Sequence, residues 1–178
     1  VSQRLGDRTM GVCTPTRNRW VTFSAGVYLL MASGHPYGFG VFAGPLKHSL
    51  GCTQRQLNYI SSIGNLGAYI GIFAGLSCDK FGPSLTAIIG SVIALVGYLL
   101  LWGVVATDAL PNLREPWIVA LLFALACQSS SWLDTAGVSA NLKNFPGQRG
   151  RVVGLLKTGL GLCSSVIAQV RMALTVFT

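Results

Sequence analysis

The sequence predicts an all-α fold, a polytopic transmembrane helix bundle with about five spans. Five apolar stretches run over residues 20–46, 57–78, 84–105, 117–140 and 152–177. About 20 apolar residues are enough to cross the hydrocarbon core of a bilayer as a helix. Charged residues make up only 10% of the chain, whereas a soluble domain carries about 25%. Helices are expected because backbone polar groups cannot stay unpaired in lipid.

The first apolar stretch, residues 20–46, is interrupted near its middle by the segment 34–40. Pro36 removes a backbone donor and clashes with the preceding turn, and the neighbouring glycines loosen the helix further. Interrupted helices near the middle of the membrane indicate a transporter's binding site. His35 and Tyr37 would then present polar groups to a cavity and are candidates for the substrate path. The alternative is a kinked helix with a purely structural role.

The second stretch, residues 57–78, follows the sequence T-Q-R-Q at 53–56, which fits a capping box at a helix start. Within the stretch, glycine at every fourth position predicts a flat groove where another helix can approach closely. These helix-packing candidates are Gly67, Gly71 and Gly75. The functional alternative is a substrate path lined by the glycine backbone.

The third and fourth stretches, residues 84–105 and 117–140, differ in polarity. The third is a plain apolar span, while the fourth has a polar face made by Ser130, Asp134, Gly137 and Asn141 at helical spacing. An ionisable group such as Asp134 is costly inside a span and usually faces a cavity or a partner. A structural ion pair and a role toward substrate or protons are both open for it. The substrate-path candidates of this span are Gln128, Ser131 and Asp134.

The fifth stretch, residues 152–177, follows an N-F-P-G turn signal at 144–147 and contains Lys157. Asp134 lies about six residues before the end of the fourth stretch, and Lys157 lies about six residues into the fifth. These two stretch ends face the same side of the membrane. At 1.5 Å per residue, both sit about 9 Å from the same membrane face. We therefore predict an intramembrane ion pair between them. The alternative is that Lys157 extends alone to the lipid headgroups.

Basic residues divide unevenly between the two ends of the predicted spans. Nine fall on one side and four on the other, which accounts for all thirteen lysines and arginines. The richer side should face the cytoplasm, which places the N-terminus inside. The net charge of +8 then reflects topology, and no nucleic-acid partner is expected. Five scattered cysteines and two separate histidines predict no metal site, and no cofactor is expected.

Two motifs resemble those of major facilitator transporters. Residues 144–157 are similar to the N-F-P-x-x-R-G-x-V-V-G-[IL]-L-K segment of the nodulin-like members. Residues 75–82 resemble the G-x-x-x-D-[RK]-x-G loop between the second and third helices of the superfamily, and the motif positions are Gly75, Asp79, Lys80 and Gly82. The resemblance covers residues 18–169, nearly the whole chain.

The resemblance implies a secondary transporter fold, in which two six-helix halves surround a central site and work by alternating access. Residues 1–18 would form a cytoplasmic tail and residues 19–178 an incomplete nodulin-like transmembrane domain. We expect a fragment or truncated half of a secondary transporter, not an enzyme, for a small solute such as an organic anion or a metal ion. The expected partners are the lipid bilayer and a missing C-terminal half or another membrane chain. The alternative is an orphan half that assists assembly or has no activity.

Overall fold

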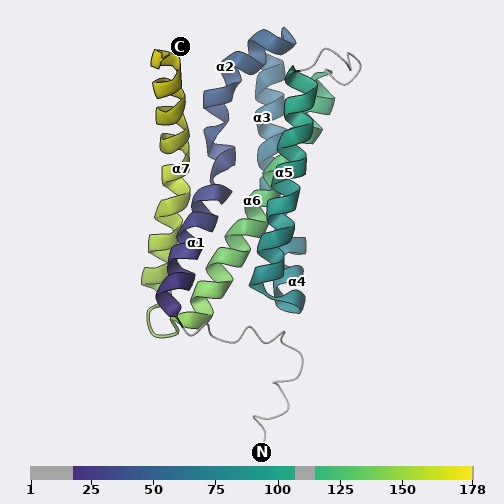
Figure 1. The fold of residues 1–178 in the computed structure, drawn as a ribbon. Coiled ribbons are helices and arrows are strands. Elements are labelled where there is room, and N and C mark those ends of the chain that lie inside the picture. The colour runs from purple at the N-terminus through teal and green to yellow at the C-terminus, as the bar shows by residue number, and fades with distance from the viewer. Residues whose placement is uncertain (1–17, 107–114, 178) are drawn as a thin grey trace, which may run out of the picture.

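The computed structural model describes residues 18–106 and 115–177, which form a bundle of long helices and no β-strand (Figure 1). Its segments are α1 (Arg19–Ser33), η1 (His35–Gly38), α2 (Phe39–Leu50), α3 (Gln54–Tyr69), α4 (Ile72–Phe81), α5 (Pro83–Ala106), α6 (Pro116–Asn144) and α7 (Arg149–Phe177). The predicted all-α membrane bundle is confirmed. Of the predicted tail, all but Asn18 lies outside the described residues.

The helices run lengthwise along the bundle (Figure 1). Four passes are helical stretches long and apolar enough to cross a membrane within the described residues, namely Gln54–Phe81, Pro83–Val105, Pro116–Asn144 and Arg149–Leu174. The first pass consists of α1 and α2, which are 15 and 12 residues long and are joined by the short 3₁₀ helix η1. The interruption predicted from Pro36 therefore divides this pass into two pieces that are each too short to span alone.

Helix α6 lies at the centre of the bundle and contacts α1, α3, α4, α5 and α7. Small residues allow this close packing, because a side chain on Gly97 of α5 would collide with Ala126 of α6. The buried apolar residues of α6 include Val119, Phe123, Cys127 and Leu133. Because five other α-helices pack on α6, its side chains can make contacts to several passes of the chain.

The three glycines predicted to form a packing groove have different surroundings. A side chain on Gly67 would collide with the Ala124 backbone of α6, so the absence of one permits the contact. At Gly71 the nearest atom would be Ser131 Oγ at 3.7 Å, an ordinary distance, and at Gly75 no atom lies within 4 Å. The reason is that the pass is interrupted between α3 and α4, so the four-residue spacing does not keep the glycines on one face.

Helix ends follow the predicted signals. Before α3, the Gln56 N–H donates to Thr53 Oγ1 at 3.4 Å and the Thr53 N–H donates to Gln56 Oε1 at 2.8 Å, which confirms the capping box. Pro116 is the first residue of α6. Helix α4 ends at Phe81 and is capped by Gly82, whose φ of +85° favours glycine. The charged motif positions, exposed on the last turn of α4, are Asp79 and Lys80.

Candidate functional site

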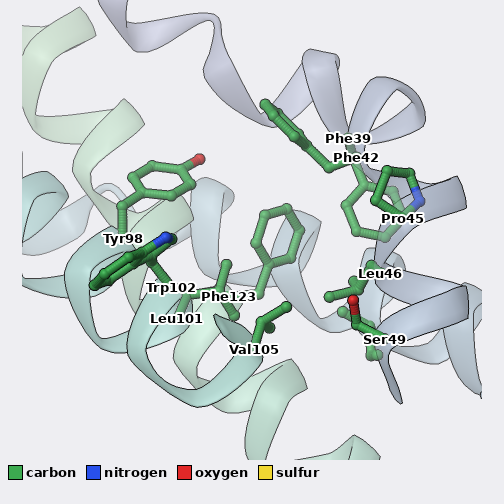
Figure 2. Close-up of a pocket in the computed structure, with 11 residues that line it drawn as sticks. Phe39, Phe42, Pro45, Leu46, Ser49, Tyr98, Leu101, Trp102, Val105 and Phe123 are labelled. Carbon is green, nitrogen blue, oxygen red and sulfur yellow. The ribbon is translucent and has the colours of Figure 1, made fainter. Parts of the chain in front are cut away.

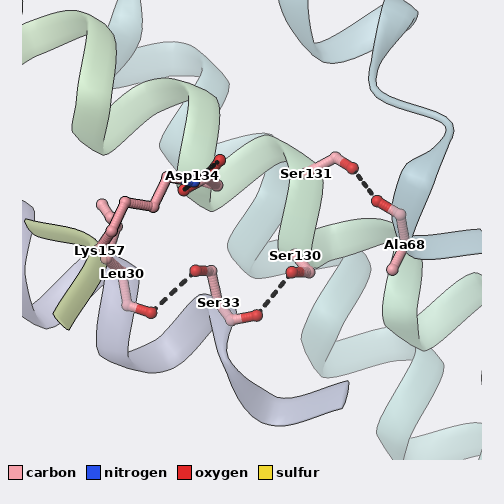
Figure 3. Close-up of polar contacts among 7 residues, drawn as sticks. All are labelled: Leu30, Ser33, Ala68, Ser130, Ser131, Asp134 and Lys157. Carbon is pink, nitrogen blue, oxygen red and sulfur yellow. Dashed lines mark hydrogen bonds and ion pairs between the residues drawn. The ribbon is translucent and has the colours of Figure 1, made fainter. Parts of the chain in front are cut away.

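Two interrupted passes meet on the same turn of α6. The first is interrupted at η1 and the second between α3 and α4. Beside η1, the Ser33 carbonyl accepts a hydrogen bond from Ser130 Oγ at 2.6 Å. At the second interruption, the Ala68 carbonyl accepts one from Ser131 Oγ (Figure 3). Since Ser130 and Ser131 are consecutive, the two interruptions lie at the same depth in the bundle.

Pro36 explains the first interruption. It has no N–H to donate to the Ala32 carbonyl four residues before it, and His35 Nδ1 lies 2.9 Å from that oxygen instead. The opposite ring nitrogen, Nε2, lies 3.5 Å from Ser129 Oγ, and the ring packs edge-on against Tyr98 of α5 at 5.2 Å. His35, a substrate-path candidate, therefore takes the place of a missing backbone donor and points toward α5.

The second interruption contains no proline and is not predicted from the sequence, which suggests one continuous helix there. Its Ile70 carbonyl accepts a hydrogen bond from Gln128 Nε2 at 2.5 Å, in addition to the bond from Ser131 to Ala68. An unpaired carbonyl in lipid costs several kcal/mol, so α6 side chains complete bonds that the interrupted helices cannot make. The substrate-path candidates Gln128 and Ser131 both use their donors in this way.

A polar cavity of about 270 Å³ lies where the interruptions meet. It is bounded by η1, the α3–α4 junction, α6 and α7, and α5 takes no part in it. Its polar lining residues are Tyr37, Asn65, Tyr69, Ser130, Ser131, Asp134, Thr135 and Lys157. Three of the five substrate-path candidates therefore line one cavity, namely Tyr37, Ser131 and Asp134, whereas His35 and Gln128 do not.

Asp134 and Lys157 are in contact inside this cavity. Lys157 Nζ lies 2.6 Å from Oδ1 and 2.8 Å from Oδ2 of Asp134, so one ammonium donates to both carboxylate oxygens (Figure 3). The side chains are 46% and 28% exposed, respectively. This is the pair of residues for which charge and depth predict an ion pair. Its partial exposure means that a solute in the cavity can reach both charges.

Sequence reasoning missed four polar residues of the cavity, and a periodic signal could have found two of them. Asn65 and Tyr69 stand four residues apart on α3 and therefore share one face of that helix. They precede the glycine-rich junction, where helix propensity is low. Thr135 follows Asp134 directly and carries no separate signal. Ser130 belongs to the predicted polar face of α6 but is not among the predicted substrate-path residues.

A second cavity, of about 230 Å³, is apolar and lies between α2, α3, α5 and α6 (Figure 2). Aromatic and aliphatic side chains make most of its wall, among them Phe39, Phe42, Leu101, Trp102 and Phe123. Such a lining offers little to a charged or polar solute. The polar cavity is therefore the candidate site.

The N-F-P motif closes the end of the bundle nearest the ion pair. Phe145 packs edge-on against Trp20 at 5.8 Å and Phe23 at 6.2 Å. The Arg19 guanidinium lies 6.0 Å from the ring centres of both Trp20 and Phe145, at a distance typical of cation–π contacts. The turn between α6 and α7 is thereby fixed to the start of α1, which holds the helices of Asp134 and Lys157 in register.

Four membrane-length helices within the described residues, packed around a polar cavity where two interrupted passes meet, define an integral membrane protein. The family model described as Nodulin-like matches residues 19–176. The chain therefore belongs to the nodulin-like family, as the motifs at residues 75–82 and 144–157 indicate.

Curated relatives support this assignment. The chain is 26% identical to Protein NUCLEAR FUSION DEFECTIVE 4 of Arabidopsis thaliana, 26% to Probable transporter mch1 of Aspergillus fumigatus, and 29% to the Oxalate:formate antiporter of Oxalobacter formigenes. These alignments cover 83%, 85% and 82% of this chain but 25%, 26% and 33% of the relatives. The chain thus spans between a quarter and a third of their length. No solved structure matches it.

Proposed function

We propose that these residues form one half of the membrane bundle of a secondary transporter, and that the polar cavity is half of its substrate path. The observation that carries the proposal is the convergence of two interrupted passes on one turn of α6, beside a partly exposed ion pair. Interrupted helices around a midplane site are typical of secondary transporters. Two of the relatives are named as a transporter and an antiporter, so transport, and not enzymatic catalysis, is the proposed activity.

The other half of the path would come from helices that face this cavity. They belong either to a longer form of this chain or to another membrane chain. The cavity is lined by η1, α3, α6 and α7, while α5 contributes nothing to it. The partner helices would therefore cover the lining elements η1, α3, α6 and α7, and α5 would face the lipid. The exposed apolar residues of α5, including Ile88, Val92 and Leu99, suit that position.

The proposed orientation places the start of α1 in the cytoplasm. The described basic residues at that end of the bundle include Arg19, Lys80, Lys143, Arg149 and Arg151. Those toward the other end are Lys47, Arg55 and Arg171. The excess of positive charge marks the cytoplasmic side of membrane proteins.

Cysteine accessibility tests whether the cavity is a path. Thr135→Cys places a thiol on the cavity wall, and Val92→Cys places one on the exposed apolar face of α5. Both changes are made together with Cys13→Ser and Cys52→Ser, since the cysteines at 78, 127 and 163 are buried. A membrane-impermeant thiosulfonate should modify the thiol at 135 from one side of the membrane and leave that at 92 unmodified. A thiol at 135 that is unreactive from both sides would contradict the proposal.

A further inference from the structure

The charged and titratable groups lining the polar cavity are few. They are Asp134 from α6, Lys157 from α7, Tyr37 from η1 and Tyr69 from α3. His35, although part of η1, packs against Tyr98 of α5 instead. With Lys157 on Asp134, the two opposite charges of the lining cancel when no solute is bound. Any charged solute that binds there has to alter the ion pair.

The remaining polar atoms of the cavity suit an anion better than a metal ion. A hard cation needs several oxygen ligands, usually carboxylates and carbonyls. Asp134 is the sole carboxylate among the lining residues, and the Ser33 and Ala68 carbonyls already accept from Ser130 and Ser131. The groups that can donate to an anion are the ammonium of Lys157, the amide of Asn65, the hydroxyl of Thr135 and one phenol of Tyr37 and Tyr69, which hydrogen-bond to each other.

The geometry of the ion pair resembles a bound carboxylate. Both oxygens of Asp134 lie within 2.8 Å of one ammonium, as the two oxygens of a small carboxylate solute would. Lys157 has a flexible four-carbon stem and three donors, so it can turn from Asp134 to a solute in the same cavity. Asp134 is on a short stem and stays with α6.

We propose that Lys157 binds a small carboxylate solute in this cavity, and that Asp134 holds Lys157 until the solute replaces it and then takes up one proton. This inference rests on the proposed function and adds the chemical class of the solute. The proton is required by charge balance, because an unpaired carboxylate inside the membrane is costly. One O–H bond forms on Asp134, the ammonium keeps its three hydrogens, and the site stays neutral.

Calorimetry on the complete chain in zwitterionic nanodiscs tests the proposal, with acetate as the probe. Titrations in two buffers of different ionisation enthalpy count the protons taken up with each acetate. We expect one proton per acetate, and an apparent affinity that falls about tenfold for each unit of rising pH while Asp134 is ionised. Asp134→Asn should bind acetate with no proton uptake and no such pH dependence.

A neutral double variant separates binding from folding. Asp134→Asn with Lys157→Met removes both charges together, so neither is left unpaired, and it should bind no acetate. Lys143→Met, which removes an exposed lysine at the end of α6, should bind like the unaltered chain. Acetate binding by the double variant, or binding by the unaltered chain without proton uptake, would overturn the inference.

The same preparations distinguish this inference from the proposed function. If the thiol at position 135 is accessible but acetate produces no heat, the carboxylate inference is wrong and the path remains. If Mn²⁺ binds and Asp134→Asn abolishes that binding, the solute is a cation and the inference is again wrong. If the thiol at 135 is inaccessible from both sides, the proposed function fails before the solute is considered.

Discussion

Most of the polar side chains in the middle of α6 donate hydrogen bonds to backbone carbonyl oxygens at the two interruptions. Ser130 donates to Ser33, Ser131 to Ala68 and Gln128 to Ile70. In water these carbonyls could bind solvent, but in a membrane interior a protein donor is needed. The two hydroxyls and the amide therefore complete backbone hydrogen bonding in other helices. Asp134 and Thr135 line the cavity and have no such role.

Ser131→Ala should reduce stability because it leaves the Ala68 carbonyl without its α6 donor. An unsatisfied buried acceptor costs about 1–3 kcal/mol. Equilibrium unfolding in mixed micelles measures the loss. The matched control is Ser165→Ala on the exposed surface of α7, which should change the unfolding free energy by less than about 0.5 kcal/mol. Equal losses in the two variants would contradict this account of residue 131.

The ion pair should show strong coupling when its partners are removed singly and together. At a pH where Asp134 is ionised, Lys157→Met leaves an unpaired carboxylate, and insertion scales set that cost at about 2.5–3.5 kcal/mol. The double variant with Asp134→Asn should lose less than Lys157→Met alone. The yield of membrane-folded protein is the measurement. Additive losses would mean that the residues act independently.

A proline inside α2 also leaves a carbonyl without a backbone donor, and a side chain from a distant helix donates to that carbonyl. Pro45 cannot donate to the Val41 carbonyl four residues earlier. The guanidinium of Arg171, near the end of α7, donates to that oxygen. The C-terminal part of α7 is thereby bound to α2, the element that follows η1 in the first pass. At three places, at Pro36, at Pro45 and at the α3–α4 junction, a side chain thus supplies a donor that the helix lacks.

Restoring the backbone donor should make Arg171 less important. Arg171→Met should lower stability by about 1–3 kcal/mol in the unaltered chain, since the Val41 carbonyl loses a charged donor. In a Pro45→Ala background the residue at 45 has its own N–H, so the same change should cost much less. The double-mutant cycle is read from unfolding midpoints. A loss from Arg171→Met that is equally large in both backgrounds would refute the link.

The elements differ in how well they could be predicted from sequence. Length and apolar content predict the passes, Thr53 and Gln56 predict the start of α3, and Pro36 predicts the first interruption. The second interruption escapes prediction because glycine lowers helix propensity without forbidding a helix. Depth along a helix can be counted, so the Asp134–Lys157 contact could be anticipated. Rotation about the helix axis depends on packing, so the spacing of Asn65 and Tyr69 predicts that they share a face of α3 but not that this face lines the cavity.

At the scale of the whole molecule, orientation can be tested with introduced thiols. Gln54→Cys and Gln148→Cys lie at opposite ends of the bundle, and both positions are exposed. In intact cells with Cys13→Ser and Cys52→Ser, an impermeant maleimide should label the first and spare the second, as the charge bias predicts. The reverse pattern would invert the orientation.

The natural Cys52 should respond differently from the introduced thiol at position 54. Burial raises the pKa of the Cys52 thiol above its ordinary value, and the thiolate is the reactive form. A raised pKa means less thiolate at a given pH, so labelling should be slow at neutral pH and should accelerate as pH rises. The exposed thiol at 54 should reach its maximal rate at a lower pH. Identical pH–rate profiles would contradict this difference.

The dependence of the early passes on α6 has a consequence for biosynthesis. Ribosomes make the chain from its N-terminus, so the passes with the Ser33 and Ala68 carbonyls enter the membrane before Ser130 and Ser131 exist. Until the fourth pass arrives, those oxygens need other donors, such as water retained at the insertion machinery or a membrane chaperone. The first two passes therefore cannot reach their final structure one at a time, and completion of α6 is the step that commits the bundle to its fold.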